Sequence, residues 1–104
     1  MKTEITTNGS AMLVKLSGRM DSTTAPELER AVNPRLEGID ALTLDFAQLR
    51  YVSSAGLRVI LALHKKMRAV EGSFTILHPN EMVMDVFEAT GFADILDIQK
   101  GEQA

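Results

Sequence analysis

Alternating apolar and polar positions near the start of the chain predict two strands joined by a tight turn. Residues 5–7 are mainly β-branched and residues 12–17 alternate between apolar and polar side chains, a pattern typical of strands with one buried face. Asn8-Gly9 lies between them, and this dipeptide readily adopts the positive φ angles of a two-residue hairpin turn. The pattern therefore predicts an opening antiparallel hairpin.

Helix signals replace the alternation after residue 23. Thr24 is of the type that caps a helix, Glu27 follows three residues later, and Pro26 fits the first turn because its missing N–H costs nothing there. Pro34 predicts the end of this helix, since proline interrupts the helical hydrogen bonds. A strand with alternating side chains follows over 41–45, and it leads into a predicted loop over 47–53.

The longest helical pattern covers residues 54–70. Its apolar residues fall within one broad arc of a helical wheel, which predicts a face packed against a core: Leu57, Val59, Ile60, Leu61, Leu63, Met67 and Val70. The opposite side carries Arg58, Ala62, Lys65, Lys66 and Ala69. That side is either a solvated face or a docking face, because its small residues allow another surface to approach closely.

The remaining chain predicts a strand, a helix and a final strand. Residues 73–77 form the first, and Asn80 is a suitable cap for a helix through Thr90 that Gly91 ends. The inward residues of this helix are predicted to be Met82, Val83, Val86 and Phe87. With a last strand at 95–98, the order is β-β-α-β-α-β-α-β. We therefore predict one α/β domain over 1–104 with a mixed β-sheet covered by helices.

Composition narrows the class of protein. A chain of 104 residues with 45% hydrophobic and 24% charged residues matches a soluble domain with a single core. It contains no cysteine, which excludes disulfides and thiolate metal sites, and it has no apolar run of membrane-spanning length and no export signal. We expect a cytoplasmic protein without membrane insertion. Its net charge of -3 does not favour nucleic acid as a partner.

No pattern of catalytic residues stands out. The chain lacks the glycine-rich phosphate loops and the nucleophile motif of hydrolases. His64 falls in the apolar arc of its helix, where we expect a hydrogen-bonded, partly buried imidazole, and His78 precedes a proline in an exposed loop. Ser54 would need a histidine oriented by a carboxylate such as Asp45, and the spacing supplies no such geometry. We expect neither an enzyme nor a bound metal or cofactor.

Charge is unevenly distributed along the chain. Between residues 47 and 70 there are five basic residues and no acidic one, whereas residues 81–97 hold five acidic residues and no basic one. Such clustering occurs by chance on solvated helices, and it also occurs on surfaces that recognise proteins. Both interpretations stay open at this point.

Two adjacent serines stand at the predicted start of the long helix. A hydroxyl there is as readily a helix cap as a modification site. A phosphoryl group at this position would meet free backbone amides and the positive end of the helix dipole, so the fold would tolerate it. Ala55 and Gly56 leave little side chain around the hydroxyls, which allows a partner to approach the backbone.

Several segments, in the right order, resemble the STAS domain family, the fold shared by bacterial anti-sigma factor antagonists and the cytoplasmic tails of sulphate transporters. The segments are LSGRMD at 16–21, APEL at 25–28, LD at 44–45, VSSAGL at 52–57 and the stretch from 79 that ends in VFEATGF at 92. Together they span nearly the whole chain.

The resemblance implies a phosphorylated serine. Family antagonists carry an acceptor serine that usually follows an aspartate and precedes a small residue, a glycine and an aliphatic residue. In that register the acceptor is Ser54, beside Ala55 and Gly56, while Ser53 occupies the aspartate position and is the second choice. Asp21 matches an acidic turn residue that the family places near the acceptor.

The resemblance also implies a partner switch in transcription regulation. The unphosphorylated protein would bind an anti-sigma factor of the histidine-kinase-like ATPase class and free a sigma factor, phosphorylation by this serine kinase would abolish binding, and a metal-dependent serine phosphatase would reset the switch. We expect Arg58, Ala62 and Lys65 to contact the partner. The alternatives are a non-switching STAS subunit of a lipid or anion transport complex or of a stress-signalling scaffold, and a small enzyme or nucleotide-binding protein.

Overall fold

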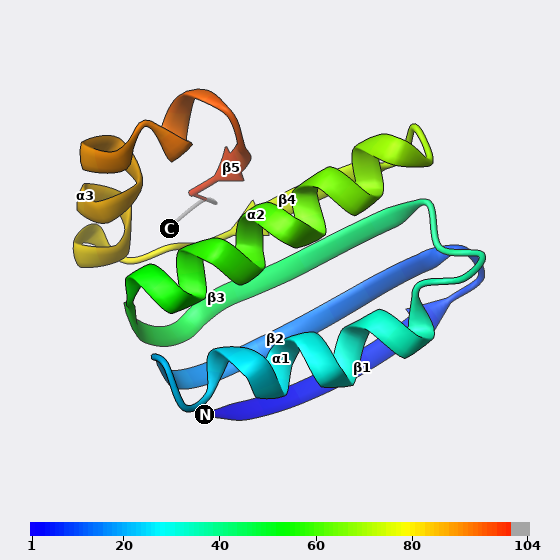
Figure 1. Cartoon of the computed structure of the whole chain (residues 1–104), viewed down its shortest axis with the longest axis horizontal. Coiled ribbons are helices and arrows are strands. Elements are labelled where there is room, and N and C mark those ends of the chain that lie inside the picture. Colours follow the sequence, from blue (N-terminus) through cyan, green and yellow to red (C-terminus); the bar gives the residue numbers. More distant parts are fainter. Residues whose placement is uncertain (101–104) are drawn as a thin grey trace.

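The computed structural model describes residues 1–100 and is built around a mixed sheet with strand order β1-β2-β3-β4-β5 (Figure 1). The strands are β1 (Lys2–Asn8), β2 (Ala11–Met20), β3 (Ala41–Val52), β4 (Ser73–Leu77) and β5 (Asp97–Gln99); the helices are α1 (Ala25–Val32), α2 (Ser54–Ala69) and α3 (Glu81–Thr90). β1 runs antiparallel to β2, and the other neighbours are parallel. The predicted order and the α/β class are confirmed.

The opening hairpin has the predicted strands but a turn displaced by one residue. Asn8 pairs with Ala11, so the two-residue turn is Gly9-Ser10 and not Asn8-Gly9. Gly9 has a φ of 62°, and it is the residue of this turn with a positive φ. Glycine adopts a positive φ without steric cost. Gly9 therefore occupies the first position of the turn, and Asn8 remains in the strand.

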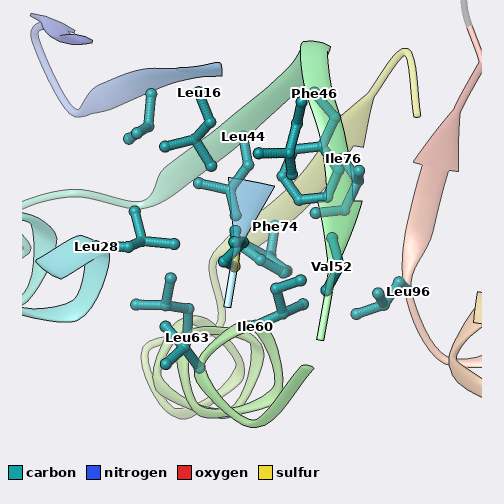
Figure 2. Close-up of a cluster of buried hydrophobic side chains, with 14 of the residues drawn as sticks. Leu16, Leu28, Leu44, Phe46, Val52, Ile60, Leu63, Phe74, Ile76 and Leu96 are labelled. Carbon is teal, nitrogen blue, oxygen red and sulfur yellow. The ribbon is translucent and has the colours of Figure 1, made fainter. Parts of the chain in front are cut away.

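One face of the sheet forms the core. Alternate side chains of the three central strands are buried on that face: Met12, Val14, Leu16, Leu42, Leu44, Phe46, Phe74 and Ile76. Figure 2 shows Leu28 from α1 and Ile60 and Leu63 from α2 directed toward them. The alternating residues of the opposite face, such as Lys15, Thr43 and Thr75, are exposed or half-buried. The helices therefore cover the apolar face, as amphipathic packing requires.

The apolar arc of α2 is confirmed over most of its length. Leu57, Val59, Ile60, Leu63 and Met67 are buried, whereas Leu61 is half-buried. Val70 was predicted to face the core but is 59% exposed. It lies beyond Ala69, where the helix ends, so the helical periodicity no longer applies to it.

β3 is longer than predicted. It continues to Val52 through the segment predicted to be a loop, and it stays paired with β2 as far as Met20. The register between the two strands shifts twice, between Lys15 and Ser17 and between Gly18 and Arg19. These irregularities interrupt the alternation of apolar and polar side chains along β3. For this reason the pattern predicted a loop over 47–53 instead of a continuing strand. The strand therefore leads directly into α2.

The two shorter helices, α1 and α3, differ from the sequence prediction in their caps and in the side chains that they bury. Thr24 makes no capping bond with its side chain, although α1 does begin at Ala25. Asn80 caps α3 by accepting a hydrogen bond of 2.7 Å from the backbone N–H of Val83, and Gly91 ends it with a φ of 84°. Val83 and Phe87 are buried and Val86 is half-buried, but Met82 is 58% exposed. The final strand covers residues 97–99 because a 3-10 turn at Phe92–Asp94 comes first.

Candidate functional site

The ends of β2 and β3 bring the acidic turn and the serine pair to one corner of the fold. Met20 pairs with Val52 in the sheet, and the backbone N–H of Ser53 donates to the carbonyl of Met20 at 2.8 Å. Asp21 and Ser53 directly follow this pair on their respective strands. The structure therefore brings together the two segments that the sequence separates by more than 30 positions.

The two serines have different environments. Ser53 has an extended backbone, and its hydroxyl oxygen accepts a hydrogen bond of 3.3 Å from the backbone N–H of Gly56, so it is the N-cap of α2. Ser54 is the first residue of the helix and its side chain is exposed. Because Ser53 supplies the cap, the Ser54 hydroxyl is left without that structural task.

Gly56 fixes how closely α2 begins against the sheet. It is buried, and a Cβ atom placed on it would lie 2.9 Å from Sδ of Met20 and 3.0 Å from Cγ1 of Val52. Only glycine allows this approach without displacing buried side chains. The first turn of α2 is thereby held at the ends of β2 and β3, with Ala55 half-buried beside it.

Asp21 organises the turn that precedes α1. Its Oδ1 accepts hydrogen bonds from the backbone N–H groups of Thr23 and Thr24, both at 3.0 Å, and from the Thr24 hydroxyl at 3.2 Å. The Thr24 Oγ1 accepts a hydrogen bond of 2.8 Å from the backbone N–H of Asp21, and the same hydroxyl donates to the carbonyl of Arg19 at 2.8 Å. The oxygen is therefore engaged by the preceding turn and does not cap α1. The backbone hydrogen bonds from Thr24 and Thr23 lower the pKa of Asp21 below its ordinary value of 3.8.

Replacement of Asp21 by asparagine is expected to reduce stability at neutral pH. Because the folded-state pKa of Asp21 is lowered, the charged carboxylate contributes stability above the unfolded pKa, and this contribution disappears as the pH falls through the folded pKa. The stability difference between wild type and Asp21→Asn should therefore narrow below about pH 4. Urea unfolding of both proteins from pH 7 down to pH 2.5 measures this stability difference. A stability difference that stays constant across this range would contradict the lowered pKa of Asp21.

A groove of about 330 Å³ opens between α1 and α2 next to the first turn of α2. It is lined by Ser22, Ala25, Pro26, Glu29, Ala55, Arg58 and Val59. This groove could not be predicted from the order of the helices along the chain. The sequence feature that could have indicated the groove is a pair of small residues, Ala25 and Ala55. They stand at the starts of the two helices and leave space between them.

The three residues predicted to contact a partner follow one another along α2 beyond the serines. Arg58 and Lys65 are exposed and Ala62 is half-buried, so all three reach the surface. Neither Arg58 nor Lys65 forms an ion pair within residues 1–100. Their charges are therefore not satisfied by an acidic neighbour in the described part of the chain.

Arg19, near the ends of β2 and β3, is restrained by an aromatic ring. The guanidinium carbon of Arg19 lies 4.2 Å from the ring centre of Tyr51, and the two residues are paired between β2 and β3. Such cation–π contacts restrain an arginine side chain. This pair could not be predicted from the sequence, because nothing in the linear spacing links residues 19 and 51.

The histidines do not complete a catalytic arrangement. The ring nitrogens of His64 have no hydrogen-bond partner within residues 1–100, which corrects the prediction of a hydrogen-bonded imidazole. The His64 ring lies 6.1 Å from that of Phe74, and burial lowers its pKa below 6.5. His78 makes a contact of 3.2 Å with the carbonyl of Lys100, and Asp45 accepts from the backbone N–H of Ala47.

The described residues contain no group of three histidine, cysteine, aspartate or glutamate side chains placed to hold a metal ion. Among the helices of residues 1–100, none is both long and apolar enough to cross a membrane.

Comparison with known proteins identifies the family and the fold. The family model described as the STAS domain matches residues 2–104. The chain belongs to the STAS domain family. This STAS domain is 33% identical over 94 residues to the candidate anti-sigma factor antagonist BtrV of Bordetella bronchiseptica, covering 89% of this chain and 81% of BtrV. It is 30% identical over 91 residues to the anti-sigma-B factor antagonist of Staphylococcus epidermidis, covering 86% and 84% of the two chains.

Solved structures share the fold of this STAS domain. The unphosphorylated form of the anti-sigma factor antagonist SpoIIAA superposes with a TM-score of 0.84 at 16% identity, covering 98% of this chain and 90% of SpoIIAA. The phosphorylated form of SpoIIAA from Bacillus gives a TM-score of 0.76 at 15% identity, with 98% and 93% covered. An anti-sigma factor antagonist from Mycobacterium paratuberculosis gives 0.86 at 23% identity, with 96% and 86% covered.

Proposed function

We propose that this STAS domain is an anti-sigma factor antagonist that acts as a phosphorylation-controlled partner switch. The unphosphorylated form binds an anti-sigma factor serine kinase of the histidine-kinase-like ATPase class and thereby frees a sigma factor. Phosphorylation at Ser54 abolishes this binding. The observation that carries the proposal is the exposed Ser54 hydroxyl at the first turn of α2, relieved of the capping role by Ser53.

In the proposed reaction the protein is a substrate and the partner is the catalyst. The Ser54 Oγ forms a bond to the γ-phosphorus of ATP, the bond from that phosphorus to the β-γ bridging oxygen breaks, and ADP leaves. The hydroxyl proton passes to a base on the kinase, which also holds the Mg²⁺. A metal-dependent serine phosphatase restores the hydroxyl by hydrolysis. Because sigma factors act on RNA polymerase, the proposal places this switch in the cytoplasm.

Release of the partner follows from electrostatics. Phosphoserine carries close to two negative charges at neutral pH, and the positive end of α2 accommodates them within this chain. At an interface, however, added negative charge that meets no cation on the partner costs several kcal/mol of binding free energy. A cost of about 3 kcal/mol already weakens binding on the order of 100-fold.

The outward side of α2 supplies the remaining contacts of the proposed interface. Arg58 and Lys65 present positive charge, and Ala55 and Ala62 are small enough for a partner helix or loop to approach. This combination fits an acidic patch on the partner, since complementary charge guides association. Ser53 stays the second choice for the phosphate.

Charge reversal on this surface is expected to weaken partner binding without unfolding the domain. Arg58→Glu combined with Lys65→Glu should lower the affinity about 10-fold or more, because attraction becomes repulsion at the interface. Arg35→Glu combined with Lys15→Glu is the matched control with the same change in charge, since these exposed residues lie in the 3-10 turn Asn33–Arg35 and on the opposite face of the sheet. Affinity and melting temperature should be measured together; a loss of affinity that merely follows a loss of stability argues against a surface contact.

A pull-down from lysate of the source organism tests the proposal. Wild type, Ser54→Ala and Ser54→Asp serve as baits in the presence of ATP and Mg²⁺, and mass spectrometry identifies the captured proteins and the phosphate position. The proposal predicts that a kinase-like anti-sigma factor accompanies Ser54→Ala, that it is lost with Ser54→Asp, and that wild type carries phosphate on Ser54. Transport or scaffold subunits captured equally by all three baits, with Ser54 unmodified, would instead indicate a non-switching STAS subunit.

A further inference from the structure

Arg58 stands one helical turn beyond the proposed acceptor. It follows Ser54 by four residues on α2, and residues at this spacing lie on the same side of a helix. Helical side chains lean toward the N-terminus, so a long side chain at position 58 extends back over the turn that begins at position 54. Arg58 is exposed and forms no ion pair within residues 1–100.

We propose that Arg58 is the internal counter-ion of phosphorylated Ser54, which captures the guanidinium that the unphosphorylated protein presents to its partner. The inference rests on the proposed function, because it requires phosphate on Ser54. A guanidinium offers forked N–H donors that match the oxygens of a phosphate, and such charge-assisted bonds are stronger than neutral ones. Phosphorylation then changes the surface twice: it adds negative charge and withdraws a positive one.

The surrounding charges leave Arg58 as the cation for this role. It is the one basic residue that lines the groove between α1 and α2. Glu29 lines the same groove from α1, and Asp21 precedes that helix, so both add negative charge near the site. Arg19, a basic residue of the adjoining strand end, lies over the ring of Tyr51. Glu29 forms no ion pair with Arg58 within residues 1–100, so the guanidinium is available to a phosphate on Ser54.

The second ionisation of the phosphate reports the pairing directly. Phosphoserine is incorporated at position 54 during synthesis, and its phosphorus resonance is followed by NMR during a pH titration. A nearby cation favours the dianion and lowers this phosphate pKa, so Arg58→Gln is expected to raise it by about 0.2 to 0.4 unit relative to wild type. Identical phosphate pKa values in the two proteins would overturn the proposal.

A matched control separates the local pair from the general charge of the helix. Lys66→Gln removes one positive charge from an exposed position of α2, about 18 Å along the helix from Ser54. This distance exceeds the screening length at physiological salt, so the phosphate pKa should not change. A shift as large as that of Arg58→Gln would count against a specific pair. Arg58→Lys, which keeps the charge but loses the fork, should give an intermediate value.

The wild-type protein offers a second readout. The Nε–H resonance of Arg58 should move when Ser54 is phosphorylated, while that of Arg35 stays in place; an unchanged Arg58 resonance overturns the pairing. Because the phosphoserine is installed without a kinase, the NMR result does not depend on the partner. Failure of the pairing leaves the partner switch intact, and failure of the pull-down leaves the NMR result valid.

Discussion

Ser54→Asp is expected to bind the anti-sigma factor on the order of 100-fold more weakly than Ser54→Ala. The aspartate places a negative charge on the exposed first residue of α2, where the proposed interface buries the wild-type hydroxyl. Ser54→Ala adds no charge and accepts no phosphate, so it should stay bound when ATP and Mg²⁺ are added. Calorimetric titration of each variant with the purified anti-sigma factor gives the two affinities.

Ser53→Asp is the matched control for this comparison. It introduces the same charge one residue earlier, and aspartate is as good a helix cap as serine, so the bond to the backbone N–H of Gly56 is preserved in kind. Family antagonists usually carry aspartate at this position. Binding of Ser53→Asp should therefore remain within a few-fold of wild type. Equal losses in Ser53→Asp and Ser54→Asp would show a general charge effect and contradict a specific role for Ser54.

Phe87→Ala is expected to lower the free energy of unfolding by about 3 to 5 kcal/mol. Phe87 is fully buried on α3, its ring centre lies 6.3 Å from that of Phe46 on β3, and it stacks on Phe92 at 6.5 Å. Truncation leaves a cavity at the contact that joins α3 to the sheet, and the rigid strand cannot collapse to fill it. Urea unfolding monitored by circular dichroism measures the loss.

Met82→Ala is the control on the same helix. Met82 is 58% exposed, so its truncation should change the free energy of unfolding by no more than about 0.5 kcal/mol. A comparable loss in the two variants would mean that α3 is not anchored through Phe87. The two variants also test where the structure departs from the sequence pattern. The pattern predicted that both side chains face inward, whereas the structure buries Phe87 alone of the two.

The helices and the core could largely be predicted from the sequence because their periodicity is regular. Leu57, Ile60 and Leu63 repeat at helical spacing, and Leu42 and Leu44 alternate within a strand. The prediction failed where a local rule met a tertiary constraint. β3 continues through an irregular pairing with β2, and the Thr24 hydroxyl oxygen accepts from the backbone N–H of Asp21 instead of capping its own helix.

The acceptor at Ser54 stays a prediction from the resemblance of VSSAGL to a family motif. The structure adds that Ser53 caps the helix while Ser54 is exposed. The groove between α1 and α2 was missed, since no sequence rule measures the space left between two helices. Arg58 is the basic residue among those that line the groove. Its lack of an ion pair within residues 1–100 is visible only in the structure.

The most direct test of the switch follows binding and phosphorylation in one sample. The purified complex with the anti-sigma factor is given ATP and Mg²⁺, and native mass spectrometry records the complex and the phosphate over time, with peptide mapping of the product. The account predicts that phosphate appears on Ser54 in step with loss of the complex, and that the Ser54→Ala complex persists. Dissociation of the Ser54→Ala complex at the wild-type rate, or a complex that survives full phosphorylation of Ser54, would contradict it.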